Sequence, residues 1–230
     1  MTISAQLDFL PTTLEHVKTE KPPDGFYSCY GVSFTEDSRI LTSCHREFHV
    51  RSSNLRIKTT AVMDEGEIVT AAVMVGNRVL TEGVSLKDNK YITYIRSMEQ
   101  LTKTVLHSED SDDPNELTFL SANKDYIVSI DIVNKLLKVF LFTTKEHLYD
   151  IQLTDMKKPY GVCLIGNVVL IADIQGGAVS KYCLSSSRAD LIWTCTGLTY
   201  PSGVTTDKSG FMYVAGLHSP YIHIISPDGE

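Results

Sequence analysis

One phrase recurs in the chain, and it limits the fold more than any other feature. Its two clearest copies begin at Gly161 and Gly203, 42 residues apart, and each continues into short apolar runs. A less regular copy places Asp131 42 residues before Asp173. A period near 42 built from short apolar strands is typical of a β-propeller, in which each repeat forms one blade. The sequence therefore predicts an all-β propeller.

The length of 230 residues fits five such repeats, whereas six would need about 250. We expect the propeller to span 24–230. The first blade is expected to have strands at 30–34, 39–43 and 48–51, and the second at 68–75, 78–81, 91–95 and 105–106. The third blade is expected to begin near 117, the fourth to cover 157–198, and the fifth to begin at 203. The acidic stretch 109–114 is interpreted as a loop between the second and third blades.

The two ends of the chain raise the question of ring closure. Residues 1–23 do not follow the repeat, but Ile3–Phe9 alternates apolar and polar residues, as a strand does. The fifth repeat shows only three strands before the turn at Pro227-Asp228-Gly229. Either the N-terminal strand completes the fifth blade, because propellers avoid open edges, or the chain is a truncated six-bladed ring. The sequence leaves both open.

Composition limits the cellular location and the class of partner that we expect. Hydrophobic residues make up 43% and charged residues 21%, which is typical of a globular domain, and the net charge of −7 argues against a mainly nucleic-acid-binding role. No DNA partner is expected. The five cysteines form no Cys-x-x-Cys pair, and we find no signal peptide and no apolar run near 18 residues. These features predict a cytoplasmic protein that does not span a membrane.

The repeat resembles a known family. Residues 201–204 (Pro-Ser-Gly-Val) with the strand 211–215 and the stretch 222–229 resemble an NHL repeat, as do 159–162 (Pro-Tyr-Gly-Val) with Ala172-Asp173. The chain is similar to the C-terminal propeller of tripartite-motif ubiquitin ligases and to related invertebrate NHL proteins. It departs from the pattern at Gly216, where the family has a strand-end aspartate, and at Phe119, where it has glycine.

The resemblance implies a binding surface rather than a catalyst. In ligase relatives the propeller selects a protein or structured RNA, and a RING domain carries out ubiquitination; this chain has no Cys/His array with RING or B-box spacing. The first expectation is therefore a non-catalytic module that binds a protein partner, with RNA as the alternative. No cofactor is expected. Two residue types of the repeat can also be explained by structure alone. Glycine at the start of an innermost strand fits the crowded propeller axis, and an aspartate at a strand end can accept hydrogen bonds from backbone N–H groups.

In a propeller, the loops that enter the innermost strands share one face with the loops between second and third strands. We predict that this face binds the partner. The residues that would form it, by their place in the repeat, are Tyr30, His45, Arg46, Glu47, Asp131, Tyr160, Asp173, Gln175, Ser202 and His218. The competing interpretation is that Tyr30 and Tyr160 pack between blades.

Other chemistry is disfavoured by the residues present. Cys44, His45 and His49 have metal-ligand types, but a structural zinc site needs four ligands and no second cluster lies near in sequence. The acidic stretch lacks the spacing of an EF-hand calcium loop. The basic residues Arg39, Arg46, Arg51, Arg56 and Lys58 could form a local RNA footprint, but a solvated strand edge is favoured.

A propeller enzyme is the rival class. Gluconolactonase-like hydrolases hold a metal with acidic and Asn ligands at the central channel. Asn123 and Asp207 lie near inner-strand ends, but toward the end opposite the entry loops. The chain has no Gly-x-Ser-x-Gly motif and no coherent carboxylate pair. We therefore expect no catalytic residues and no bound metal.

Overall fold

The structure is a computed structural model that describes residues 31–34, 40–44, 47–51, 57–62, 67–76, 78–85, 90–97, 103–110, 119–217, 219 and 221–229. These residues form five antiparallel sheets. Blade one contains β1 (Gly31–Phe34), β2 (Ile40–Cys44), β3 (Glu47–Arg51) and β4 (Ile57–Val62). Blade two contains β5 (Glu67–Val75), β6 (Arg78–Ser85), β7 (Lys90–Ser97) and β8 (Lys103–Asp110). In each blade every strand pairs with its neighbours in sequence.

The second half of the chain continues the same pattern. Blade three contains β9 (Phe119–Ala122), β10 (Tyr126–Asp131), β11 (Leu136–Leu141) and β12 (His147–Gln152). Blade four contains β13 (Pro159–Ile165), β14 (Val168–Asp173), β15 (Ala178–Leu184) and β16 (Ala189–Thr196). Blade five has three strands among the described residues: β17 (Pro201–Thr206), β18 (Met212–Gly216) and β19 (Ile222–Ile225). The chain is a β-propeller.

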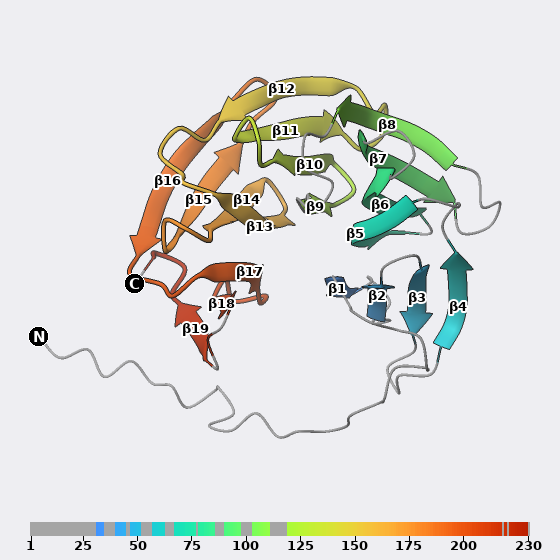
Figure 1. Cartoon of the computed structure of the whole chain (residues 1–230). Helices are drawn as coiled ribbons and strands as arrows, with labels where there is room; N and C mark the ends of the chain where they lie inside the picture. The colour runs from blue at the N-terminus through green and yellow to red at the C-terminus, as the bar shows by residue number, and fades with distance from the viewer. Residues whose placement is uncertain are drawn as a thin grey trace, which may run out of the picture.

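The blades follow one another around a common centre. Their innermost strands contact one another in the order β1, β5, β9, β13 and β17. Figure 1 shows these five strands nearest the centre, with the first and fifth blades at the two ends of an arc. The predicted five blades and the three strands of the fifth are confirmed. The proposed closing strand Ile3–Phe9 lies outside the described residues.

Packing between blades explains why the middle strands are apolar at successive positions. In β14, Val169 and Ile171 pack against blade three, whereas Leu170 and Ala172 pack against Met212 and its neighbours in blade five. Successive side chains of a strand point to opposite faces, and both faces of this sheet are covered. Val169 and Ile171 are fully buried. Full burial of one such side chain contributes roughly 1.5–3 kcal/mol.

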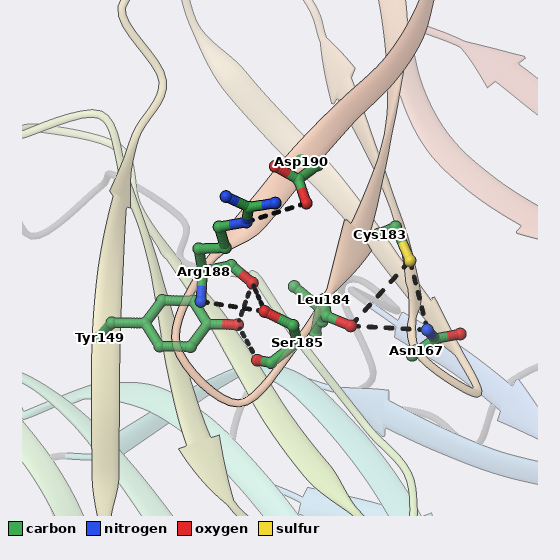
Figure 2. A network of polar contacts seen from close by, with 7 residues as sticks. All are labelled: Tyr149, Asn167, Cys183, Leu184, Ser185, Arg188 and Asp190. Carbon is green, nitrogen blue, oxygen red and sulfur yellow. Dashed lines mark hydrogen bonds and ion pairs between the residues drawn. The ribbon is translucent and has the colours of Figure 1, made fainter.

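Polar contacts also join blades three and four at the end opposite the entry loops. The Tyr149 hydroxyl of β12 donates to the carbonyl oxygens of Ser185, at 2.6 Å, and Arg188, at 2.9 Å (Figure 2). The Arg188 guanidinium bonds to Asp190 at 3.2 Å. The Asn123 side chain donates to the Gly166 carbonyl at 2.7 Å. These bonds tie β12 and the β9–β10 turn to two turns of the next blade.

Two parts of the sequence interpretation need correction. Glu109 and Asp110 belong to β8 rather than to a loop, because the ladder pairs them with Tyr91 and Lys90. The fourth strand of blade one, β4, was not predicted at all. Backbone pairing with the neighbouring strand outweighs the low β-propensity of acidic residues in the first case.

The part of the chain that the structure describes holds no helix long and apolar enough to cross a membrane.

Candidate partner-binding face

Strand register places the entry loops and the loops between second and third strands at one end of the blades. In blade four, Pro159 pairs with Asp173, Asp173 with Ala178, and Ala178 with Thr196. All four positions therefore lie at the same end. Its loop residues in blades three to five are 131–135, 153–158, 173–177, 197–200, 217, 219 and 221, and the strand ends beside them complete it. We call it the entry-loop face.

Two predicted contact residues of this face hold its loops instead. The Asp173 carboxylate is 3% exposed and accepts hydrogen bonds from the backbone N–H groups of Lys157, Lys158 and Gly176 at 2.7, 2.8 and 2.9 Å. Asp131 is 7% exposed and accepts from the backbone N–H of Asn134 at 2.9 Å. A charge withdrawn from water needs such donors. The expected turn-holding role of these aspartates is confirmed, and their side chains are not available as a contact surface.

The other described members differ in exposure. Gln175 is exposed, and Ser202 is partly exposed with its hydroxyl 3.3 Å from the Ala215 carbonyl oxygen, to which it donates. Tyr160 is half-buried and its ring lies 4.1 Å from that of Phe119, centre to centre. Burial raises the pKa of the Tyr160 phenol. The structure thus brings Tyr160 into contact between blades, as the competing interpretation proposed.

The remaining predicted members fall outside the part of the chain whose side chains are described. Tyr30, His45, Arg46 and His218 lie outside the described residues. Glu47 begins β3, but its side chain is not described.

An exposed apolar group on blade five was missed by the sequence interpretation. Tyr200, Leu217 and Tyr221 are 54%, 47% and 73% exposed, and all three lie in the loops of the entry-loop face. The Leu217 N–H donates to the Tyr200 carbonyl at 2.8 Å, which joins two of these loops. We call these three residues the apolar tip. The available signal was the placement of each tyrosine beside a proline in the sequence, Pro201 or Pro220.

The backbone explains why the loops at the tip lie close together. A Cβ atom at Gly216 would overlap the Thr199 carbonyl oxygen. Tyr200, which follows Thr199 in the chain, has φ 44°, in the left-handed region that few non-glycine residues adopt. The glycine at residue 216, where Asp173 stands in blade four, therefore follows from a close approach of the entry loop to the end of β18.

Exposure at the tip also reflects its place at the end of the arc. Leu217 occupies the position that Ile132 and Ile174 occupy after the strand-end aspartates of blades three and four. Those two isoleucines are each 8% exposed, and Ile132 belongs to the core shared by blades three and four. Leu217, at 47%, has no such cover among the described residues.

The charges around the face are mixed. Lys157 and Asp155 are both exposed in the loop before β13. A mixed face with exposed aromatic residues is typical of protein recognition.

Asp207 and Asn123, the two residues considered as ligands of a channel metal, accept hydrogen bonds from backbone N–H groups of their own turns. Asp207 accepts from the N–H groups of Ser209, at 2.8 Å, and Phe211, at 3.0 Å, and from the Tyr213 hydroxyl at 3.0 Å. Asn123 accepts from the N–H groups of Asp125 and Tyr126, each at 2.9 Å. Over the residues that the structure describes, no group of three or more His, Cys, Asp or Glu side chains could hold a metal ion. The side chains of Cys44, His45 and His49 are not described.

Solved structures with this fold support the propeller architecture. A protein of unknown function from Bacteroides caccae is 15% identical with a TM-score of 0.66, and the match covers 90% of this chain and 80% of that one. Virginiamycin B lyase from Staphylococcus aureus is 12% identical with a TM-score of 0.63, covering 88% and 68%. Hsv2 from Kluyveromyces lactis is 13% identical with a TM-score of 0.58, covering 87% and 61%.

At these identities the likeness shows the fold alone. The chain spans about three fifths of the length of Hsv2. No family model and no curated protein matches the sequence.

Proposed function

We propose that this propeller is a non-catalytic interaction module that binds a protein partner through the apolar tip of blade five. The observation that carries the proposal is the exposure of Tyr200, Leu217 and Tyr221 at the end where the loops gather. Tyrosine supplies a large contact area with little rotamer entropy to lose and is enriched in binding hot spots. The bond between the Leu217 N–H and the Tyr200 carbonyl preorganises two of the contributing loops.

The finer proposal is that the chain acts as the substrate-selecting propeller of a ubiquitin-ligase-like protein in the cytoplasm. The support is the NHL-like pattern and its placement: the two Pro-x-Gly-Val phrases begin the inner strands β13 and β17. Asp173, at the family's strand-end position, binds the backbone of the loop that enters blade four.

The test uses the purified full chain as bait in quantitative capture from a cell lysate. Tyr200→Asn removes the ring and keeps a residue that tolerates positive φ. Leu217→Ser and Tyr221→Ser remove the other two apolar groups. The matched control is Leu191→Ser on β16, because Leu191 is 51% exposed but lies away from the entry-loop face.

A partner that uses the tip is retained by the native chain and by the Leu191→Ser chain and is lost with each tip variant. Truncation of a hot-spot tyrosine costs about 2 kcal/mol or more, which is a loss of roughly 30-fold in affinity. The loss is then measured by titration calorimetry with the purified partner. Equal retention by all five chains would exclude the tip as the binding surface.

RNA is the second candidate, favoured because exposed tyrosines and the exposed Lys157 lie on the same entry-loop face. Exposed aromatic rings can stack on bases, and lysines neutralise phosphates. Titration with a mixed RNA pool at two salt concentrations separates the candidates, because RNA binding weakens steeply with salt. Salt-dependent binding that weakens in Lys157→Gln and Tyr221→Ser would replace the protein-partner proposal.

A further inference from the structure

A small pocket lies between blades four and five at the end opposite the entry-loop face. It is formed where the β13–β14 turn and the β17–β18 turn meet the β15 strand, and its volume is about 230 Å³. Its lining residues are Ile165, Val168, Leu170, Lys181, Thr206, Asp207, Lys208, Gly210 and Met212.

The floor of the pocket is apolar and fixed. Leu170 and Met212 are 2% and 1% exposed and belong to the core shared by blades four and five. The Lys181 ammonium donates to the Pro227 carbonyl at 2.9 Å and lies 5.6 Å from the centre of the Trp193 ring. Both contacts hold the lysine in place, so the pocket wall it forms is preformed.

The rim is preformed as well and carries one available positive charge. Asp207 is engaged by two backbone N–H groups and by the Tyr213 hydroxyl, which fixes the 206–212 turn. Lys208 follows it and is exposed, and no described carboxylate lies within ion-pair distance of its ammonium. Asp207 keeps its negative charge, but its oxygens already accept these three hydrogen bonds, so the Lys208 ammonium is the charged group at the mouth that is available to a ligand.

The size of the pocket selects its occupant. Sites for drug-sized ligands have volumes of about 300–1,000 Å³, and an apolar cavity of about 150 Å³ holds one benzene. A volume of about 230 Å³ therefore accommodates one aromatic side chain. The lysine at the mouth favours a carboxylate beside that ring.

We propose that this pocket binds the aromatic side chain of a peptide in which an acidic residue adjoins the aromatic one. The ring occupies the space above Leu170 and Met212, and the carboxylate pairs with the Lys208 ammonium. The site lies at the other end of the blades from the apolar tip, so it stands independently of the function proposed for that tip.

The experiment measures the ¹⁹F NMR line width of short peptides that carry 4-fluorophenylalanine. This line width reports binding with Kd values up to the millimolar range. The peptides are Gly-Ser-(4-F-Phe)-Glu-Ser-Gly, its Glu-(4-F-Phe) isomer, and the matched forms with Lys in place of Glu. We expect line broadening with at least one acidic form, at least fivefold weaker binding of the lysine forms, and competition by unlabelled Phe-Glu peptide but not by Ala-Glu peptide.

Two variants and a control connect binding to the pocket. Lys208→Glu is expected to weaken binding of the acidic peptides at least fivefold. Thr206→Trp, which places a ring in the pocket, is expected to abolish binding. Lys124→Glu is the control, because Lys124 is exposed in the corresponding turn of blade three, where Asn123 takes the place of Asp207. Thermal melting confirms that each variant folds.

The proposal is overturned if neither acidic peptide broadens at 1 mM. It is also overturned if Ala-Glu competes as well as Phe-Glu, or if Lys124→Glu weakens binding as much as Lys208→Glu does. Should Thr206→Trp fail to fold, the Lys208→Glu and Lys124→Glu pair still decides the question.

Discussion

Gly216 lies so close to the Thr199 carbonyl oxygen that any side chain at residue 216 would overlap it. In blade four the corresponding strand end is Asp173, whose carboxylate accepts hydrogen bonds from the backbone N–H groups of Lys157 and Lys158. In both blades a backbone bond joins the strand end to the entry loop: Ile174 N–H donates to the Lys158 carbonyl at 3.0 Å, and Leu217 N–H donates to the Tyr200 carbonyl at 2.8 Å. Blade four adds the buried Asp173 carboxylate, whereas blade five has no side chain at the corresponding position.

Asp173→Ala is expected to lower the free energy of unfolding by about 2–4 kcal/mol. The substitution leaves two backbone donors of the entry loop, Lys157 and Lys158, and one of the β14–β15 loop, Gly176, without their acceptor. Hydrogen bonds to charged groups contribute roughly 1.5–3 kcal/mol each, with losses that are not additive. Urea unfolding followed by circular dichroism measures the change. Asp190→Ala is the control, because its ion pair with Arg188 is exposed and such pairs contribute about 0–1 kcal/mol. Equal effects of the two substitutions would contradict the role assigned to Asp173.

Gly161→Ala and Gly203→Ala are expected to differ although both glycines occupy the same place in the repeat. A Cβ at Gly161 would overlap the Ser202 carbonyl oxygen of the next blade, whereas a Cβ at Gly203 would have the Ala215 Cβ as its nearest neighbour at 3.7 Å. Overpacking of this kind costs about 1–3 kcal/mol. Thermal melting of both variants should show a lower Tm for Gly161→Ala only. A lower Tm for Gly203→Ala would show that another element covers β17.

Tyr149→Phe is expected to lower the free energy of unfolding by about 1–3 kcal/mol, because two carbonyl oxygens lose their shared donor. The bonds are those shown in Figure 2. The measurement is urea unfolding at pH 7. Tyr221→Phe serves as the control, since Tyr221 is 73% exposed. A loss of the same size in the control would mean that the Tyr149 hydroxyl contributes nothing specific.

The contribution of Tyr149 also has a pH dependence. Burial, followed by the charge of Tyr126, raises the pKa of the Tyr149 phenol above its ordinary value of 10.0. A folded-state pKa above the unfolded one stabilises the protein fully below the unfolded pKa, and this is lost as pH rises through the folded pKa. The stability difference between the native chain and Tyr149→Phe should therefore shrink above pH 10. A difference that stays constant to pH 12 would contradict this assignment.

Cys163 is expected to resist alkylation. Burial raises the pKa of its thiol to about 11, outweighing hydrogen bonds from the Thr205 side chain and the Thr206 backbone, which lower it. At pH 8 only about one thiol in a thousand would then be ionised, and the thiolate is the reactive form. Iodoacetamide labelling mapped by mass spectrometry should modify Cys163 far more slowly in the folded protein than in urea. Comparable rates in the folded and the unfolded protein would rule out this protection.

The regular part of the fold could be predicted because its residues repeat. Asp131 and Asp173 end the second strands of blades three and four, as their spacing of 42 residues required. β4 was missed because its stretch, Ile57–Val62, carries no copy of the repeated phrase. Glu109 and Asp110 were placed in a loop because the acidic residues around them suggested solvent, whereas pairing with β7 extends the strand.

The candidate site was less predictable because exposure depends on the neighbouring blade. The same loop position is buried as Ile132 and exposed as Leu217. The sequence placed Asp173 on the correct face, but it could not show that three backbone N–H groups surround its carboxylate. Tyr200 was overlooked since a tyrosine with positive φ is not indicated by any local pattern.

The pairing of each described strand with its sequence neighbours has an evolutionary consequence. Because no strand among the described residues crosses from one sheet to another, a duplication or deletion of one whole repeat, made in the loop between Thr196 and Pro201, would change the number of blades while leaving the described hairpins intact. The number of repeats can therefore vary without a change in any partner-binding loop.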